Sequence, residues 1–160
     1  MGRGVDKAAL FGDRSEAALR AAGAARVGLI GGADLPDLSP GHGPLGGLVT
    51  ALTQAEEPVV AVLACDLPLV TAGAVRAVVD GLGGHDVAVA AADGRRHPLL
   101  AAYRVTALGG LEDALGAGEL ALRRALRRLD VVEVPLADPA WATNVNQPED
   151  VAGLSGRRRP

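Results

Sequence analysis

One stretch near the middle of the chain, Val59 to Val70 (VVAVLACDLPLV), restricts the fold more than any other. Its unbroken apolar start is rich in β-branched residues, which predicts a strand buried on both faces of a largely parallel sheet. Pro68 cannot donate to a central ladder, so the strand must end near Asp66. Open α/β sheets bind ligands at the carboxyl ends of their strands, which makes Asp66 a candidate functional carboxylate. A capping role for Asp66 is the weaker alternative, because Thr71 lies nearer to the next predicted helix.

Composition restricts the class of protein. The 160 residues suffice for one domain with a substantial core, and 49% are hydrophobic whereas 22% are charged. An aromatic content of 2% and a net charge of -3 argue against a nucleic-acid partner, which needs stacking side chains or a basic surface. The single cysteine, Cys65, favours a reducing cytoplasm. No apolar run reaches membrane-spanning length, so we expect a cytoplasmic protein without a membrane partner.

The first part of the chain predicts an incomplete supersecondary unit. An alanine-rich helix is expected over Arg14–Ala25 and a short buried strand over Val27–Gly32. A helix followed by a strand is half of a βαβ unit, so the first strand of the fold is predicted to be missing. The loop 33–47 is rich in proline and glycine and long enough to suggest ligand binding. Pro44 predicts the start of the helix that follows.

The second half predicts one strand that breaks the parallel pattern. Asp93-Gly94, between β-capable segments, is the strongest short signal for a hairpin. We therefore expect the strand Pro98–Arg104 to run antiparallel to the strand Asp86–Ala92. The other predicted elements are a helix over Thr71–Leu82, two helical segments within Ala107–Leu129, a strand over Asp130–Pro135, and a polar turn over Ala142–Asp150 that leads to a short final helix.

Basic side chains raise the question of an anionic ligand. The helix predicted over Glu119–Leu129 carries arginines on one side, at positions 123, 124, 127 and 128. A charge run at helical spacing is usually a solvated face, and a polyanionic substrate is the sharper alternative. His97 opens the antiparallel strand and is either a substrate ligand or a surface turn residue. Taken alone, His97 favours the surface interpretation.

Five short motifs, in this order and at these separations, are together characteristic of one family. They are MGRGVDKAAL, GPLGGL, ACDLPLV, RHPLLAAYR and NVNQPEDV. With them the chain resembles the molybdenum cofactor guanylyltransferases, which are nucleotidyltransferases with a Rossmann-like, three-layer αβα fold. The resemblance covers Met1 to about Leu154. It implies one nucleotidyltransferase-like domain over residues 1–154, followed by a disordered basic tail over residues 155–160.

The resemblance implies an enzyme that transfers GMP from GTP to molybdopterin carrying molybdenum and releases pyrophosphate. It implies Mg²⁺ as the cofactor, GTP and molybdopterin as small-molecule partners, and molybdopterin-synthesis proteins or molybdoenzymes as candidate protein partners. A cytidylyltransferase, or another nucleotidyltransferase of the same fold, stays open as an alternative. So does a truncated, non-catalytic module that binds only the pterin.

Site residues follow from the matched motifs. The resemblance makes Asp66 the Mg²⁺ ligand and catalytic carboxylate, and it makes Lys7 the catalytic lysine that contacts the nucleotide phosphates. Asn144, Asn146 and His97 are implied as substrate-binding residues, and Asn146 also as a metal ligand. The residues implied for the nucleotide pocket, besides Lys7 and Asp66, are Asp37 (a nearer match than Asp34), Gly43, Pro44, Leu45 and Gly46.

The start of the chain departs from the family pattern. The family opens with a strand and the loop L-A-G-G-x-S-x-R-M-G, and this chain begins at the M-G of that loop. Either the start codon is assigned too late, or the protein is truncated and of doubtful activity. The intact downstream motifs favour the first explanation.

Overall fold

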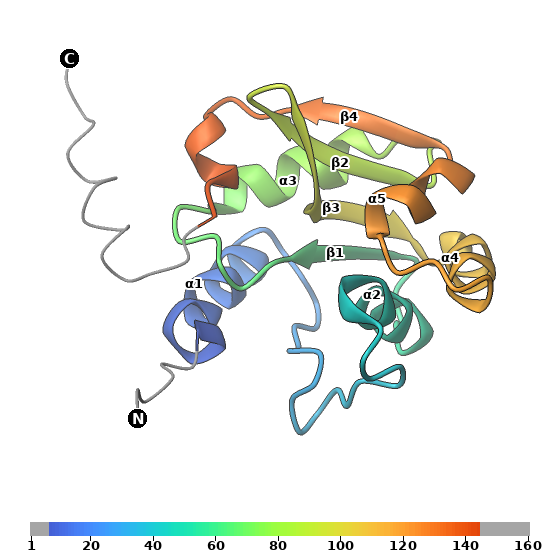
Figure 1. Cartoon of the computed structure of the whole chain (residues 1–160). Helices are drawn as coiled ribbons and strands as arrows, with labels where there is room; N and C mark the ends of the chain where they lie inside the picture. The colour runs from blue at the N-terminus through green and yellow to red at the C-terminus, as the bar shows by residue number, and fades with distance from the viewer. Residues whose placement is uncertain (1–6, 145–160) are drawn as a thin grey trace, which may run out of the picture.

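The computed structural model of the chain describes residues 7–144, including the side chains of residues 13–144. At its centre a four-stranded sheet has the order β1-β3-β2-β4, formed by β1 (Val59–Leu63), β2 (Val87–Ala92), β3 (Arg95–Arg104) and β4 (Val131–Pro135) (Figure 1). β2 and β4 pair in parallel, whereas β3 pairs antiparallel with both β1 and β2. Three strands therefore share one direction and β3 opposes them, as the sequence predicted.

Helices cover both faces of this sheet, which confirms the predicted Rossmann-like αβα layers (Figure 1). α1 (Lys7–Ala21) and α3 (Ala72–Gly81) pack on one face in one core cluster. A second core cluster on the other face draws on three helices: α2 (Gly43–Thr53), α4 (Leu108–Gly116) and α5 (Leu122–Ala125). Three short 3-10 turns are also present, at Val105–Ala107, Leu126–Arg128 and Pro139–Ala142. Among the helices of residues 7–144, none has the length and apolar character that a membrane crossing requires.

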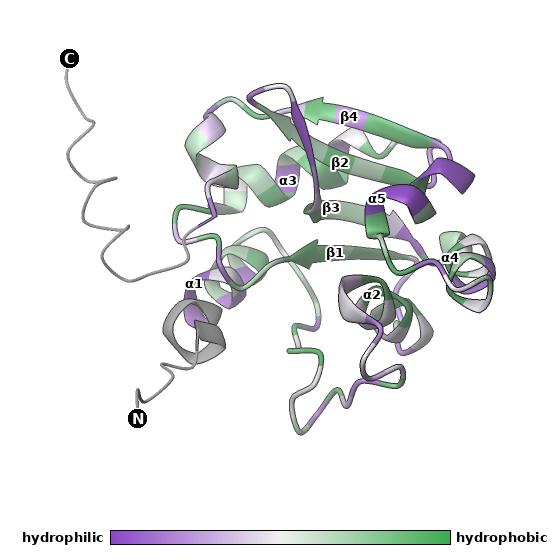
Figure 2. Cartoon of the chain, in the orientation of Figure 1, coloured by the Kyte–Doolittle hydropathy of each residue, from purple (hydrophilic) through white to green (hydrophobic). Residues whose placement is uncertain are grey.

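The two cores follow from the alternation of side chains along β2. Val87 and Val89 belong to the cluster on the α2 side, whereas Ala88 and Ala90 belong to the cluster on the α3 side. All four are fully buried. Figure 2 shows the resulting distribution, in which hydrophobic residues dominate the strands and hydrophilic residues gather on α5 and at the β2–β3 hairpin. Sequence alternation thus builds two apolar layers and leaves these polar elements at the surface.

The β2–β3 connection confirms the predicted hairpin. Asp93 and Gly94 have φ angles of 51° and 70°, and two consecutive positive φ angles characterise the type I′ turn that favours this dipeptide. β3 starts at Arg95, earlier than the predicted Pro98, because Arg95–His97 already pair with β2. The strand that breaks the parallel pattern was therefore predicted from its turn, and only its first residue was wrong.

Two predictions for strands in the first half of the chain are wrong. Val27–Gly32 forms no strand, since Ile30 makes only an isolated bridge to Leu35 and Leu29 is 50% exposed. A strand needs a ladder partner, and within residues 7–144 no strand of the sheet pairs with this segment. The prediction that β1 is buried on both faces is wrong for a related reason, since β1 also lacks a ladder partner on one side among the described strands. β1 lies at the edge of the described sheet, and all five of its residues are half-buried instead of buried on both faces.

Helix boundaries differ from the predictions in two places. The first helix lies earlier than the predicted Arg14–Ala25, ending at Ala21. The helix predicted over Glu119–Leu129 is reduced to the four residues of α5 and a following 3-10 turn. Its start is delayed because Glu119 Oε1 accepts a hydrogen bond from the N–H of Ala121 at 2.8 Å, a local turn that competes with helix formation. The short final helix and the basic tail lie outside the described residues.

β3 contains a bulge that interrupts its pairing with β2. Val89 pairs with Ala101, but the next residue, Ala90, pairs with His97. Pro98–Leu100 therefore have no partner on β2, and the strand is locally pushed out of the ladder. Bulges of this kind are common beside functional sites because they redirect side chains.

The bulge is held from two sides. On the β1 side, Leu63 pairs with Leu100, and the N–H of Ala64 donates to the carbonyl of Leu99 at 2.7 Å. From the core, the hydroxyl of Tyr103 donates to the carbonyl of Pro98 at 2.7 Å. Tyr103 is fully buried. Backbone and side-chain hydrogen bonds therefore hold the bulge in place, and it is not a frayed strand end.

Burial of Tyr103 makes the stability of the fold depend on alkaline pH. Burial raises the pKa of Tyr103 above its ordinary value of 10.0 because the phenolate loses hydration in the core. Below pH 10 both the folded and the unfolded chain keep the phenolic proton, so the free energy of unfolding does not depend on pH through this group. Above pH 10 only the unfolded chain releases it, and the free energy of unfolding should fall by up to about 1.4 kcal/mol per pH unit.

Urea denaturation at several pH values between 9 and 11 tests this expectation. Tyr103 is the only tyrosine of the chain, so absorbance of the phenolate follows this one group. Tyr103→Phe should lose the additional alkaline slope. Equal slopes for the two proteins would contradict the assignment.

Candidate active site

The turn that carries Asp66 follows β1 directly. β1 ends at Leu63, Asp66 lies in the turn before Pro68, and α3 begins at Ala72. The cap of α3 is Thr71, whose Oγ1 accepts from the N–H of Ala74 at 3.3 Å. Asp66 therefore does not cap the helix. Its carboxylate remains available for another role at the carboxyl end of a strand.

Asn144 contacts Asp66 across 78 positions of sequence. The Nδ2 of Asn144 donates to Oδ2 of Asp66 at 3.2 Å. The other carboxylate oxygen, Oδ1, is buried and has no hydrogen-bond partner among the described residues. A buried acceptor without a donor is costly, and a water molecule, an ion or a ligand can supply the missing partner. The geometry thus fits a carboxylate that receives a cation or a ligand donor.

α1 fastens this turn to the body of the domain. The Nη1 of Arg14 donates to the carbonyl of Pro68 at 2.8 Å, and the Oγ of Ser15 donates to the carbonyl of Ala64 at 3.3 Å. Ser15 is buried at this contact. Sequence reasoning placed Arg14 and Ser15 in the first predicted helix and assigned neither a role at the Asp66 turn. The spacing of an alanine-rich helix does not indicate that two of its polar side chains support a distant turn.

The loop before α2 is held by a polar contact that involves Asp37. Oδ1 of Asp37 accepts from the N–H of Ser39 at 2.8 Å and from Oγ1 of Thr50 at 3.0 Å. Oγ1 of the buried Thr50 in turn accepts from the N–H of Leu38 at 2.9 Å. One carboxylate oxygen of Asp37 therefore positions the loop on α2. The implied contact of Asp37 with nucleotide stays a prediction.

The residues implied for the nucleotide pocket begin α2. Gly43 has a φ of +58°, and Pro44 occupies the first turn, where it needs no hydrogen-bond donor. Leu45 is fully buried in the core. Gly46 is also buried, and a Cβ there would lie 2.7 Å from the carbonyl oxygen of Ser39.

Gly46→Ala should therefore destabilise the domain, whereas Gly47→Ala should not. A Cβ at Gly46 would also lie 2.8 Å from the Cβ of His42, so backbone must shift, at a cost of about 1–3 kcal/mol. A Cβ at Gly47 would meet only Ile30 at 3.7 Å, an ordinary contact, and alanine should stabilise the helix by roughly 0.5–1 kcal/mol. Thermal unfolding of both variants tests the pair. Equal Tm changes would contradict the packing argument.

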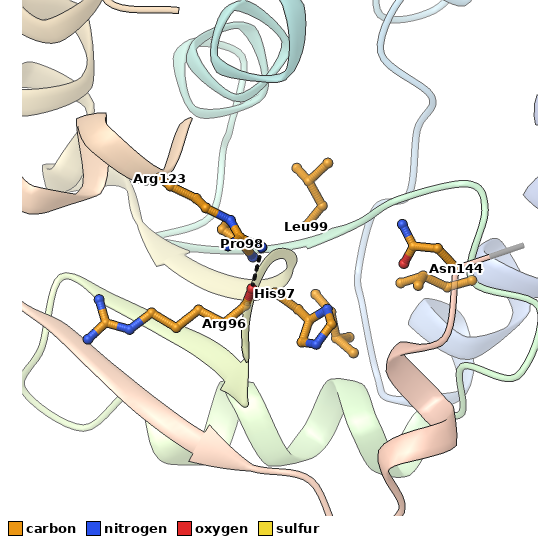
Figure 3. A pocket seen from close by; sticks show the side chains of 8 residues that line it. Arg96, His97, Pro98, Leu99, Arg123 and Asn144 are labelled. Carbon is orange, nitrogen blue, oxygen red and sulfur yellow. Dashed lines mark hydrogen bonds between the residues drawn. The ribbon is translucent and has the colours of Figure 1, made fainter. Parts of the chain in front are cut away.

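A cavity of about 140 Å³ lies beside Asn144 and the β3 bulge (Figure 3). Its lining comes from three parts of the fold: Arg96, His97, Pro98, Leu99 and Leu100 of β3, Arg123 of α5, and Leu67 with Asn144 near the Asp66 turn. The residues implied for the nucleotide pocket do not line it. The structure thus brings His97 and Asn144 to one cavity and leaves the start of α2 apart from it.

Two implied site residues are not placed. Lys7 begins α1, but its side chain lies outside the described residues, as does the whole of Asn146. Within the described residues, no group of three or more His, Cys, Asp or Glu side chains is arranged to hold a metal ion. The implied roles of Lys7 and Asn146 therefore stay predictions.

Comparison with known proteins identifies the family. Residues 7–134 match the model described as the MobA-like NTP transferase domain. The chain belongs to this family. The motif resemblance to molybdenum cofactor guanylyltransferases is thereby confirmed, and the domain is a nucleotidyltransferase domain.

Curated relatives of this MobA-like chain carry consistent names. A probable molybdenum cofactor guanylyltransferase of Bacillus velezensis is 34% identical over 119 residues, covering 71% of this chain and 60% of the relative. A probable molybdenum cofactor guanylyltransferase of Deinococcus radiodurans is 36% identical over 124 residues, covering 76% and 64%. The chain thus spans less than two thirds of the length of these relatives.

Solved structures agree on the fold of the MobA-like domain. The molybdopterin-guanine dinucleotide biosynthesis protein A of Archaeoglobus fulgidus matches with a TM-score of 0.62 and 28% identity, covering 73% of this chain and 63% of that one. The 2-C-methyl-D-erythritol 4-phosphate cytidylyltransferase of Thermus thermophilus matches with a TM-score of 0.68 and 21% identity, covering 91% and 88%. At that lower identity the second likeness concerns the fold alone.

Proposed function

We propose that the chain transfers GMP from GTP to molybdopterin carrying molybdenum and releases pyrophosphate. The observation that carries the proposal is Asp66, held by Asn144 at the end of β1 with Oδ1 unpartnered among the described residues, in a MobA-like NTP transferase domain. The names of the relatives support guanylyl transfer in particular. Molybdopterin-synthesis proteins or molybdoenzymes as protein partners belong to the same proposal, as does the cytoplasmic location expected from the single cysteine.

The reaction requires little acid–base catalysis by the protein. A phosphate oxygen of the acceptor forms a bond to the α-phosphorus of GTP, while the bond from that phosphorus to the bridging oxygen breaks and pyrophosphate leaves with the electron pair. The acceptor phosphate is already anionic at neutral pH, so no strong general base is required. The site must position the two substrates and offset charge at the phosphates.

The environment of Asp66 fits a divalent cation. Mg²⁺ is usually held by one or two carboxylates together with substrate phosphates and water, so a single well-placed carboxylate is sufficient. Oδ1 of Asp66 is an acceptor without a donor among the described residues, and Asn144 orients the carboxylate through Oδ2. Bound there, Mg²⁺ would neutralise charge on the phosphates. We propose Asn146 as a second ligand.

The remaining roles complete the proposed site. Lys7, at the start of α1, is proposed to contact the nucleotide phosphates and to offset charge on the leaving pyrophosphate. The start of α2, with the loop that Asp37 anchors, is proposed to bind the nucleotide through backbone groups. His97 and Asn144, which line the cavity, are proposed to face the acceptor.

A direct assay tests the proposal. Purified chain with Mg²⁺, molybdenum-bearing molybdopterin and GTP should release pyrophosphate and form the guanine dinucleotide, and CTP should support much less turnover. Preference for CTP would favour the cytidylyltransferase alternative. Binding of the pterin without turnover with either nucleotide would favour the non-catalytic module. A variant with L-A-G-G-x-S-x-R placed before Met1 shows whether that loop changes GTP binding or turnover.

A further inference from the structure

The cavity beside Asn144 contains an arginine, Arg123, that has no carboxylate partner among the described residues. Arg96 and Arg123 both line the cavity, but Arg96 points away from Asn144 and pairs with Glu133, Nε to Oε1, at 2.5 Å (Figure 3). Arg123 donates from Nη2 only to the carbonyl of Arg96, at 3.3 Å, and has no carboxylate partner among the described residues. A guanidinium has five N–H donors, and most of those on Arg123 have no acceptor in the part of the chain that the structure describes.

Two neighbouring arginines, Arg124 and Arg127, differ from Arg123 in their partners or their position. Arg124 pairs with Glu119, Nε to Oε2, at 3.2 Å and does not line the cavity. Arg127 is exposed on the following 3-10 turn and does not line the cavity either. Within residues 13–144, Arg123 is therefore the arginine of this run that lines the cavity and lacks a carboxylate partner.

The rest of the wall is preorganised for a small anion. His97 and the bulge residues Pro98–Leu100 form one side, and the bulge is held by Tyr103 and by its pairing to β1. His97 is half-buried, so its ring adds a directional donor with limited freedom. Asn144, which is bonded to Asp66, lies at the other side. A group in the cavity is thus close in the structure to the candidate catalytic carboxylate.

The size of the cavity indicates what it can hold. Pockets that enclose a whole small ligand usually measure about 300–1,000 Å³, and this cavity is well below that range at about 140 Å³. It suits a single charged group whose remaining molecule extends outside. A phosphate matches both the planar donor fork of arginine and the basic, half-polar lining.

We propose that this cavity binds a phosphate monoester through Arg123 and His97, and that the monoester is the attacking phosphate of the acceptor substrate. The second half of this inference rests on the proposed function. In this arrangement Arg123 holds the acceptor phosphate on the β3 side of Asp66. Arg123 therefore determines affinity for the acceptor and not for the nucleotide.

Inorganic phosphate is the probe for the site itself. In the full chain, proton NMR resolves the Cε1–H signals of the three histidines, and His97→Gln assigns the one in the cavity. Titration with phosphate should shift the His97 signal saturably, whereas His85, which is paired with Asp130, serves as the internal reference. Arg123→Gln should weaken the apparent affinity roughly tenfold, the loss expected for one charge-assisted contact. Arg127→Gln makes the same charge change outside the cavity and should leave the titration unchanged.

Steady-state kinetics test the link to the acceptor. Arg123→Gln should raise the KM for the acceptor roughly tenfold while the KM for GTP stays as in the unmodified chain, and Arg127→Gln should change neither. Absence of a saturable His97 shift, or equal behaviour of the two variants in both assays, would overturn the inference while leaving guanylyl transfer intact. A phosphate titration that depends on Arg123, in a chain without guanylyl transfer, would support the anion site and refute only the proposed function.

Discussion

Asp66→Asn should reduce pyrophosphate release from GTP by roughly 10²–10³-fold or more, because asparagine preserves the shape of the side chain but removes its charge. The substitution retains an oxygen that can accept from Asn144, as Oδ2 does now at 3.2 Å. It removes the acceptor at Oδ1, which is buried without a partner among the described residues. The loss should therefore concern catalysis and cation binding. The free energy of unfolding should change by no more than about 1 kcal/mol, because no existing hydrogen bond is lost.

Two measurements separate a catalytic role from a structural one. Turnover is measured over a range of Mg²⁺ concentrations, and stability is measured by urea denaturation followed through the fluorescence of Trp141, the only tryptophan. Asp80→Asn, at an exposed position of α3, makes the same chemical change and should alter neither quantity. Full turnover by the Asp66 variant at saturating Mg²⁺ would refute the proposed role.

Tyr103→Ala should have the largest effect on stability, a loss of about 3–5 kcal/mol in the free energy of unfolding. The ring is fully buried between β3 and the helices α2, α4 and α5, so its removal leaves a void in that core. The hydroxyl is also the donor to the carbonyl of Pro98 in the bulge. A domain of this size is stabilised by only about 5–15 kcal/mol, so the variant should be close to unfolding at physiological temperature.

Tyr103→Phe separates the ring from the hydroxyl. It retains most of the buried volume and loses only the bond to Pro98, at an expected cost of about 1–3 kcal/mol. Urea denaturation of both variants gives the two contributions. A phenylalanine variant as unstable as the alanine variant would show that the hydroxyl, and not the packing of the ring, dominates at this position.

Sequence reasoning was successful where a residue type restricts the backbone locally. Pro68 indicated the end of β1 before Asp66, and Asp93-Gly94 predicted both the hairpin and the antiparallel direction of β3. Thr71 was the nearer cap, which left the Asp66 carboxylate available for the site. Each of these conclusions depends on one or two neighbouring residues and therefore needs no knowledge of tertiary contacts.

The remaining features depend on pairing between distant segments. An apolar run looks the same at the edge of a sheet as at its centre, so the half-burial of β1 and the failure of Val27–Gly32 to form a strand could not be anticipated. Helical periodicity likewise treats the arginines from position 123 to 128 as one face. In the structure, Arg123 is the one arginine of this run that lines the cavity. Its place there depends on the register shift in β3 and on the short α5, which helical periodicity does not predict.

The segment between His97 and Ala101 connects the cavity to the end of β1. It forms a wall of the cavity, and it is hydrogen-bonded to the end of β1 through Ala64, two residues before Asp66. A ligand bound against this wall therefore contacts a segment that is hydrogen-bonded to the backbone leading to the Asp66 carboxylate. We expect occupancy of the cavity and binding at Asp66 to be thermodynamically linked. Phosphate should then alter the apparent affinity for Mg²⁺, and Mg²⁺ should alter the affinity for phosphate by the same factor.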